Sequence, residues 1–330
     1  MSNILVTGGA GFIGSHVADG LLADAHRVTV LDDLSGGFRE NVPSKAEFVE
    51  GSILDPALLK KLFEKHAFEY VFHLAAYAAE GLSHFIKHFN YENNLIGSVH
   101  LINLSILHRI RCFVFTSSIA VYGKNQLPMS EDMIPEPEDS YGIAKYAVEQ
   151  ELRASHQMFG LPYTIFRPHN VYGERQNIGD KYRNVVGIFM NQIMQNQPMT
   201  IFGDGNQKRA FSYIGDVAPA IARSIQIPEA ANQVFNIGAD QPYTVRELAR
   251  EVAHVFGVEP KIQYLARRNE VEEAYCDHAK ARKILKAESR TSLGQGLGRM
   301  AEWAKRHGAR KSQDFKNIEV PVNLPPSWKT

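Results

Sequence analysis

Short apolar runs alternate with amphipathic stretches of helical period along the first half of the chain. The apolar runs, which we expect to form buried strands, cover residues 3–7, 28–32, 47–51, 70–76, 111–118 and 163–168. The stretches between them predict helices over residues 12–24, 56–66, 91–109 and 141–159. Strands rich in Val, Ile and Phe that are separated by helices indicate a parallel sheet with helices on both faces. The pattern therefore predicts the α/β class and a doubly wound parallel sheet.

The pattern changes after residue 168, where a polar segment begins. Residues 169–209 are rich in Gly, Asn, Gln and Arg and are broken by one helix-like stretch over 185–196. Shorter strand-like and helix-like runs follow, so we expect a smaller mixed α/β C-terminal domain that binds the substrate. This predicts a first domain over residues 1–168, with some later segments packing back on it, and a second over 169–330.

The composition argues against several classes of function. Lys and Arg together number 36, equal to the 36 Asp and Glu, so the chain lacks the basic surplus typical of nucleic-acid-binding proteins. No run of about 18 apolar residues predicts a membrane span, and the N-terminal pattern is not that of a secretory signal. The two cysteines and thirteen histidines show no metal-ligand spacing. We therefore expect a cytoplasmic protein with no metal, no nucleic-acid partner and no membrane partner.

A glycine-rich segment, TGGAGFIG, joins the first predicted strand to the first predicted helix. Gly8, Gly11 and Gly14 allow a tight turn and let the backbone approach a pyrophosphate, while the helix N-terminus supplies free N–H groups. Asp32 ends the next strand, where a carboxylate binds ribose hydroxyls and repels a 2′-phosphate. The segment predicts a Rossmann-type dinucleotide-binding sheet that takes NAD. Arg39 follows closely in the sequence, and its positive charge leaves NADP as an alternative cofactor.

The sequence YGIAK places Tyr141 and Lys145 four residues apart at the start of a predicted helix, so that they share one face. A tyrosine acts as a base only when its pKa, about 10, is lowered. A nearby ammonium and a positive nicotinamide ring both favour the phenolate, and lowering the pKa by roughly three units requires about 4 kcal/mol. Ser118, at the end of the fifth strand, is expected to share a hydrogen bond with the reacting hydroxyl. We predict Ser118, Tyr141 and Lys145 as the catalytic residues.

These motifs together resemble the extended short-chain dehydrogenase/reductase family, and within it the nucleotide-sugar epimerases typified by UDP-galactose 4-epimerase. The resemblance spans nearly the whole chain and includes the segments HLAA, SSIAVYG, RPHNVYG, IFGDG…RAFSYIGDV and RRNEV. Dehydratases of the family carry an Asp-Glu pair just after the serine or threonine, and UDP-glucuronate decarboxylases carry a Glu there. Ile119 and Ala120 occupy these positions here and can act neither as acid nor as base. The resemblance thus implies NAD-dependent 4-epimerisation of a UDP-hexose through a transient 4-keto intermediate.

The resemblance also implies positions for the cofactor and the substrate. The cofactor-binding residues are expected to be Gly8, Gly11, Phe12, Ile13, Gly14, Asp32, Ser52, Ile53, Leu74, Ala75, Ala76, Asn94, Ser117, Tyr141, Lys145, Pro168 and His169. The substrate-binding residues are expected to be Ser118, Asn170, Asn184, Val185, Phe202, Arg209, Arg267 and Glu270. Of the latter, the diphosphate is assigned to Asn170, Arg209 and Arg267, the uridine pocket to Asn184, Val185 and Phe202, and its ribose to Glu270.

Three departures from the UDP-galactose 4-epimerase pattern leave the sugar open. Ser52 replaces an Asp that contacts adenine, and Ala78 replaces a Lys near the cofactor. Ala274 replaces a bulky residue, and its small side chain leaves room for the N-acetyl group of UDP-N-acetylglucosamine. Arg175 and Arg183 could pair with a sugar carboxylate, which admits UDP-glucuronate as well.

Two segments have no assigned role. Residues 77–90 are expected to border the sugar, and residues 316–330 are expected to form an extended tail on the surface or on a partner.

The alternatives to an epimerase are an NAD-dependent nucleotide-sugar dehydrogenase or reductase of the same family and a non-catalytic NAD-binding protein. Members of the family usually pair through the helices predicted over 91–109 and 141–159, so the resemblance implies a homodimer.

Overall fold

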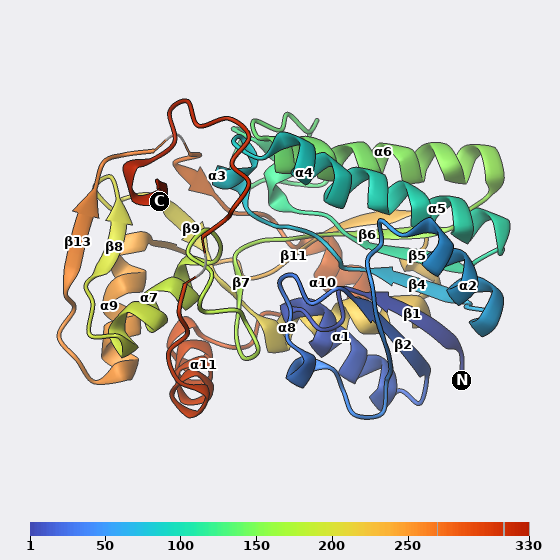
Figure 1. Ribbon diagram of the computed structural model, residues 1–330, viewed down its shortest axis with the longest axis horizontal. Helices are drawn as coiled ribbons and strands as arrows, with labels where there is room; N and C mark the ends of the chain where they lie inside the picture. The colour runs from blue at the N-terminus through green and yellow to red at the C-terminus, as the bar shows by residue number, and fades with distance from the viewer. Residues whose placement is uncertain (269, 313, 330) are drawn as a thin grey trace.

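A seven-stranded parallel sheet forms the centre of the molecule in a computed structural model, which describes residues 1–268, 270–312 and 314–329 (Figure 1). The strand order is β11-β6-β5-β4-β1-β2-β3. The bounds are β1 (Asn3–Thr7), β2 (Arg27–Asp32), β3 (Glu47–Glu50), β4 (Tyr70–His73), β5 (Cys112–Thr116), β6 (Tyr163–Pro168) and β11 (Gln233–Ile237). The order reverses between β1 and β4, where doubly wound sheets open a crevice for ligands. The predicted Rossmann-type α/β fold is confirmed.

Helices cover both faces of this sheet. One face carries α1 (Phe12–Ala23) and α8 (Ile214–Arg223), and the other carries α2 (Pro56–His66), α5 (Gly97–Leu107) and α6 (Ser140–Phe159). Successive strand side chains point to opposite faces, so Ile4 and Val6 pack in the first layer while Leu5 packs in the second. The apolar runs are buried on both sides, which explains why they lack a polar alternation.

The sequence also determines where several helices begin and end. Asp55 caps α2 by accepting hydrogen bonds from the backbone N–H groups of Ala57 and Leu58, both at 3.0 Å. The long helix α6 ends at Gly160, whose φ of 71° is the left-handed conformation that glycine adopts without strain. These are the helix signals that the sequence pattern contained.

Two elements differ most from the prediction. Strand β4 stops at His73 because its neighbour β1 stops opposite it at Thr7, and residues 74–76 leave the sheet. The helix predicted over 91–109 begins earlier, as α4 (Lys87–Tyr91), and continues through a π turn (Glu92–Ile96) into α5. The π turn inserts one extra residue without interrupting the apolar pattern, so the pattern could not reveal it.

The C-terminal part of the chain adds small sheets and helices at the carboxyl end of the strands. Its strands are β7 (Val171–Tyr172), β8 (Met199–Phe202), β9 (Lys208–Ala210), β10 (Ser212–Tyr213), β12 (Pro242–Thr244), β13 (Ile262–Leu265) and β14 (Glu273–Ala274). Its helices are α7 (Val185–Met194), α9 (Val245–Phe256), α10 (Ala279–Leu285) and α11 (Leu293–His307). Strand β11 and helix α8 come from this half of the sequence but pack in the central sheet layer.

The last segment of the chain lies across its own fold, above α3 (Glu80–Ser83) (Figure 1). The backbone N–H groups of Glu319 and Val320 donate to the carbonyl oxygen of Phe85, at 2.9 and 3.2 Å. Leu324 and Trp328 are buried in a cluster with apolar residues of the segment 77–90. The tail thus lies on the surface, as predicted, and it is packed on this chain.

Candidate active site

A cavity of about 480 Å³ opens at the carboxyl ends of the central strands, beside the point where the strand order reverses. This is the place and the size typical of small-molecule sites in open α/β sheets. It brings together most of the predicted site residues. Those that line it are Gly8, Gly11, Phe12, Ile13, Gly14, Asp32, Ile53, Leu74, Ala75, Ala76, Ser117, Ser118, Tyr141, Lys145, Pro168, Asn170, Asn184, Val185, Phe202, Arg209 and Glu270.

The glycine loop between β1 and α1 leaves no room for side chains. Gly8 has a φ of +72°, and a Cβ there would lie 2.6 Å from the backbone N of Ala75. A Cβ on Gly14 would lie 2.1 Å from the carbonyl oxygen of Gly8. The loop therefore brings bare backbone and the N-terminus of α1 to the cavity wall, which suits a pyrophosphate.

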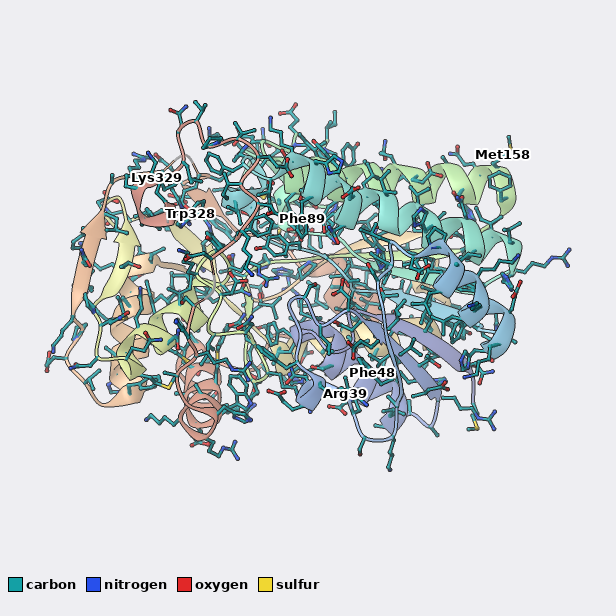
Figure 2. The ribbon with its side chains drawn as sticks, viewed as in Figure 1. Arg39, Phe48, Phe89, Met158, Trp328 and Lys329 are labelled. Atoms are coloured by element: carbon teal, nitrogen blue, oxygen red, sulfur yellow. The ribbon has the colours of Figure 1, made fainter. Side chains whose placement is uncertain are left out.

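Asp32 ends β2 at the edge of this loop. Its two carboxylate oxygens accept hydrogen bonds from the backbone N–H groups of Ala10, at 3.0 Å, and Leu34, at 2.8 Å. A carboxylate has about four acceptor positions, so Asp32 keeps acceptors for ribose hydroxyls. Arg39 lies with its guanidinium 3.9 Å from the ring centroid of Phe48, outside the residues that line the cavity (Figure 2). This end of the cavity fits the dinucleotide NAD.

The predicted catalytic residues meet at the opposite wall. Tyr141 and Lys145 lie on the first turns of α6, and Ser118 follows β5. The Lys145 ammonium donates to the carbonyl oxygen of Thr116 at 2.9 Å and lies 5.8 Å from the ring centroid of Tyr141. The backbone N–H of Tyr141 donates to the hydroxyl of Ser83 at 3.1 Å. The start of α6 is therefore held on the segment 77–90.

The electrostatics of this wall differ from the sequence-based expectation. Burial, and after it the charge of Glu80, raises the pKa of Tyr141, while Ser118 acts in the opposite direction. Burial also lowers the pKa of Lys145 to about 7, against the charge of Glu149. Lys145 was expected to lower the pKa of Tyr141, but burial outweighs that effect among the protein groups. A further positive charge in the cavity is therefore needed to lower the pKa of Tyr141 enough for the phenolate to form.

The apolar residues that follow Ser118 lie away from the reacting groups. Ile119 packs in a buried cluster with Val121 and Cys276, and the backbone N–H of Ala120 donates to the Ser118 hydroxyl at 3.1 Å. Ser117 donates to Glu149 at 2.6 Å. The end of β5 therefore presents a hydroxyl to the cavity and no carboxyl group of its own.

Four predicted site residues lie outside the cavity lining. Ser52 accepts a hydrogen bond from the N–H of Leu54 at 3.2 Å. Asn94 is buried and holds the backbone N–H and C=O of Tyr77, at 2.8 and 3.1 Å. His169 is buried against His278, with the Nε2 atoms 2.9 Å apart. Arg267, with a side chain 69% exposed, pairs with Glu272. Asn94 thus supports the lining residue Tyr77 from behind, and His169 lies between the lining residues Pro168 and Asn170.

Arg268 lines the cavity, whereas Arg267, which the resemblance assigned to the diphosphate, does not. The guanidinium of Arg268 lies 4.5 Å from the ring centroid of Phe202 and donates to Glu270 at 3.0 Å. The guanidinium of Arg209 donates to three backbone carbonyl oxygens, those of Lys208, Val271 and Glu272. Arg209 therefore has no carboxylate partner among the residues that the structure describes, and its charge faces the cavity.

The structure weakens two arguments about the sugar. Ala274 is packed in the buried cluster behind Ile119 and does not line the cavity, so its small size does not widen the site. Arg175 pairs with Asp19 at 2.6 Å, and Arg183 pairs with Asp180 at 2.5 Å. Arg175 has a carboxylate partner and lies outside the cavity lining, whereas Arg183 lines the cavity with its guanidinium paired to Asp180.

Sequence reasoning missed several lining residues. The segment 77–90, which is predicted to border the sugar, lines the cavity through Tyr77, Ala78, Glu80, Gly81, His84 and Phe89, of which the sequence analysis singled out only Ala78. Further lining residues without a sequence signal include Asp139, Gln176, Asn177, Tyr182 and Arg268. The position of 77–90 directly after a strand end at the crevice was the one available signal, and the sequence alone did not indicate which side chains turn inward.

Comparisons with known proteins agree with this geometry. The model of the NAD dependent epimerase/dehydratase family matches residues 4–238. A putative UDP-glucose 4-epimerase of Methanocaldococcus jannaschii is 37% identical over 305 residues, which cover 92% of this chain and 98% of the relative. Within the described part of the chain, no helix has the length and apolar character needed to cross a membrane.

Two solved structures resemble the whole fold. The UDP-glucose 4-epimerase of Thermotoga maritima, solved with UDP-glucose, has a TM-score of 0.88 and 38% identity, covering 92% of this chain and 99% of that one. The UDP-glucuronic acid 4-epimerase of Bacillus cereus, solved with UDP-glucuronic acid and NAD, has a TM-score of 0.85 and 28% identity, with coverages of 92% and 99%.

Proposed function

The chain belongs to the NAD-dependent epimerase/dehydratase family, and from that membership we propose that it interconverts the two carbon-4 epimers of a UDP-hexose. The observation that carries the proposal is the convergence of Ser118, Tyr141 and Lys145 on one cavity whose other wall is the glycine loop. A nucleotide sugar and a dinucleotide can meet there at the reacting carbon. The alternative, a dehydrogenase of the same family, would use the same residues but exchange its cofactor in each cycle.

The protein groups divide the chemistry between them. Tyr141, as phenolate, accepts the proton of the hydroxyl at carbon 4, and the Ser118 hydroxyl positions that group. NAD, when bound, supplies the acceptor for the hydride and a positive ring that favours the phenolate. Lys145 is held at the carbonyl oxygen of Thr116 and adds positive charge when protonated. The proton returns from Tyr141 after the 4-keto sugar has turned its other face to the site.

The substrate nucleotide is assigned to the far end of the cavity. Phe202, Asn184 and Val185 offer an apolar and amide surface for the uracil, and Glu270 offers acceptors for its ribose. Arg209, whose charge has no described carboxylate partner, is suited to the diphosphate. We assign Arg268 to this end in place of Arg267, because it is Arg268 that stacks on Phe202.

The test uses purified protein with no added cofactor. UDP-glucose, UDP-N-acetylglucosamine and UDP-glucuronate are incubated separately, and the products are identified by proton NMR. We expect one or more of the sugars to be converted to its carbon-4 epimer, and we expect Tyr141→Phe to lose this conversion while it retains NAD. Formation of NADH only after NAD is added, without epimerisation of any sugar, would contradict the proposal and favour the dehydrogenase.

A further inference from the structure

Glu80 is the feature of the cavity that the proposed function leaves unexplained. It lies in the short helix α3, in the segment 77–90 for which the sequence provided no role, and its side chain lines the cavity. No described residue donates a hydrogen bond to its carboxylate or forms an ion pair with it. The carboxylate is open to the cavity, so its acceptors are free for a ligand.

The surroundings place Glu80 at the reacting end of the cavity. Burial, and after it the charge of Glu80, raises the pKa of Tyr141, and the charge of Asp139 raises the pKa of both groups. Ser83 joins the two residues, because its hydroxyl accepts from the backbone N–H of Tyr141 at 3.1 Å and donates to the carbonyl oxygen of Glu80 at 2.6 Å. Glu80 and Tyr141 therefore line the same part of the cavity. Asp139 is engaged as the cap of α6, where it accepts from the N–H of Gly142 at 2.8 Å.

The backbone of Glu80 is fixed on both sides. Its carbonyl oxygen accepts a hydrogen bond from the hydroxyl of Ser83 at 2.6 Å. The next residue, Gly81, packs under the ring of Trp328 so closely that a Cβ would lie 3.2 Å from it. The carboxylate is therefore presented to the cavity from a constrained turn, which is the condition for a residue that discriminates between ligands.

The nearby positive charges do not neutralise Glu80 directly. Arg268 donates to Glu270 at 3.0 Å, and Arg183 pairs with Asp180 at 2.5 Å. The guanidinium of Arg209 donates to backbone carbonyl oxygens. The carboxylate of Glu80 thus has no ion-pair partner among the described residues, although the charges of Arg209 and Arg268 oppose the rise of its pKa.

From this arrangement we infer that Glu80 is a specificity-determining residue, which accepts hydrogen bonds from the hydroxyls of a neutral hexose and rejects hexuronates. The inference rests on the proposed function, because it assumes that carbon 4 of the sugar lies at Tyr141. The carboxylate of a hexuronate is attached two bonds from carbon 4, so it would enter the same part of the cavity as Glu80. Like charges brought together in a partly desolvated site oppose binding, which supplies the discrimination.

The experiment measures binding and turnover separately, with NAD-containing protein. Dissociation constants for UDP-glucose, UDP-N-acetylglucosamine and UDP-glucuronate are determined by calorimetry for the wild type, Glu80→Gln and Glu92→Gln. Glu92 is the matched control, because it lies on the π turn after this segment, outside the cavity lining. For the wild type we expect UDP-glucuronate to bind on the order of 10- to 100-fold more weakly than the neutral sugars. Glu80→Gln should bring the dissociation constant of UDP-glucuronate close to those of the neutral sugars. Glu92→Gln should leave the ratio of these constants unchanged.

The outcomes separate this inference from the proposed function. Equal affinities of the wild type for UDP-glucose and UDP-glucuronate, or an unchanged ratio in Glu80→Gln, would overturn the role of Glu80 even if epimerisation is observed. The affinity ratio tests Glu80 without turnover, so a protein that binds UDP-sugars but epimerises none contradicts the proposed function alone. Retained NAD and an unchanged unfolding midpoint in Glu80→Gln show that the variant is folded. Glu80→Ala should also bring the dissociation constant of UDP-glucuronate closer to that of UDP-glucose.

Discussion

The phenol of Tyr141 lies where burial and the charge of Glu80 both favour its neutral form. Its use as a base therefore depends on positive charge at the cofactor side, and Tyr141→Phe removes the hydroxyl that takes the proton. We expect Tyr141→Phe to lower kcat by about 10²- to 10⁴-fold, the range for loss of a general base, with little change in bound NAD. The measurement is the epimerisation rate by NMR, with NAD quantified after denaturation. Tyr146→Phe on the same helix, outside the cavity lining, should keep full activity.

Lys145 illustrates the conflict between stability and activity at a single residue. Its side chain is buried, and burial lowers its pKa from 10.5 to about 7. Between these two values the unfolded chain binds a proton that the folded chain does not, so the folded state gains stability as pH rises through this window. We expect Lys145→Met in NAD-free protein to raise the unfolding midpoint by a few degrees at pH 7. The gain should shrink towards pH 10, where the wild-type lysine is neutral in more of the unfolded chain. A lower midpoint at pH 7 would mean that the hydrogen bond to Thr116 outweighs the cost of burying the amine.

The discrimination that we assign to Glu80 should depend on pH. Glu80 is exposed to the cavity, and desolvation by the protein atoms around the cavity, with the charge of Asp139 next, raises its pKa to about 7. An acid with a raised pKa is neutral below that value and ionised above it, so the repulsion of a hexuronate is weak at pH 6 and strong at pH 8. The other charged or titratable groups that act on it are Arg209, Arg268, Glu270 and Tyr141. We expect the dissociation constant of UDP-glucuronate, divided by that of UDP-glucose, to rise several-fold over this range. The ratio should be flat in Glu80→Gln, and a flat ratio in the wild type would contradict the assignment.

At the scale of the elements, the C-terminal tail supports the cavity wall that we assign to the substrate. Trp328 is 4% exposed and lies near the opposite end of the molecule from Met158 (Figure 2). Its ring centroid is 5.3 Å from that of Tyr182 and 6.5 Å from that of Phe202, and it packs on Gly81. The tail therefore joins the segment 77–90 to the wall assigned to uridine.

Removal of the Trp328 ring should weaken binding of the UDP-sugar more than it slows the chemical step. We expect Trp328→Ala to raise KM for the UDP-sugar about tenfold, the lower end for loss of a buried aromatic anchor, while kcat changes less than threefold. Steady-state kinetics and NAD content are the measurements. Val322→Ala, a change at a 68% exposed residue of the same tail, is the matched control. A fall in kcat at unchanged KM would show that the tail acts on the catalytic residues instead.

The sequence predicted the elements whose signals are local, and missed those that depend on distant partners. The strands, the capping of α2 by Asp55 and the end of α6 at Gly160 follow from apolar runs, a capping side chain and a glycine. The end of β4 at His73 is determined by where β1 ends, and the π turn is matched to the backbone of Tyr77 through Asn94. Neither partner is visible in the local pattern.

The same distinction holds for the site. The glycine loop, Asp32 and the Tyr141–Lys145 pair have fixed spacing along a strand end or one helix face, so the sequence locates them. Arg267 and Arg268 are equivalent in the sequence, and only packing on Phe202 determines which one enters the cavity. Glu80 could not be identified either, because its orientation depends on a turn held by Ser83 and the tail.

The molecule as a whole has an apolar surface that its own fold does not cover. Helices α5 and α6 lie side by side on one outer edge of the molecule (Figure 1). Large apolar side chains on these helices and at their ends are exposed, namely Ile96 (45%), Leu107 (74%), Ile143 (43%), Met158 (76%) and Phe159 (64%). Exposed apolar side chains gathered on neighbouring helices mark an interaction surface. We propose that two copies of the chain pair through α5 and α6, as the resemblance implies.

Sedimentation velocity tests this pairing. We expect the wild type to sediment as a dimer at micromolar concentration and Ile96→Arg to sediment as a monomer, because a charge in the apolar centre of a two-fold interface is repeated in both subunits. Val258→Arg places the same charge at a residue of similar exposure, 46%, just beyond α9 in the C-terminal part of the fold. This control should remain dimeric, so that loss of the dimer in both variants would indicate a general charge effect. A monomeric wild type would contradict the pairing and leave the apolar surface of α5 and α6 without a partner from this chain.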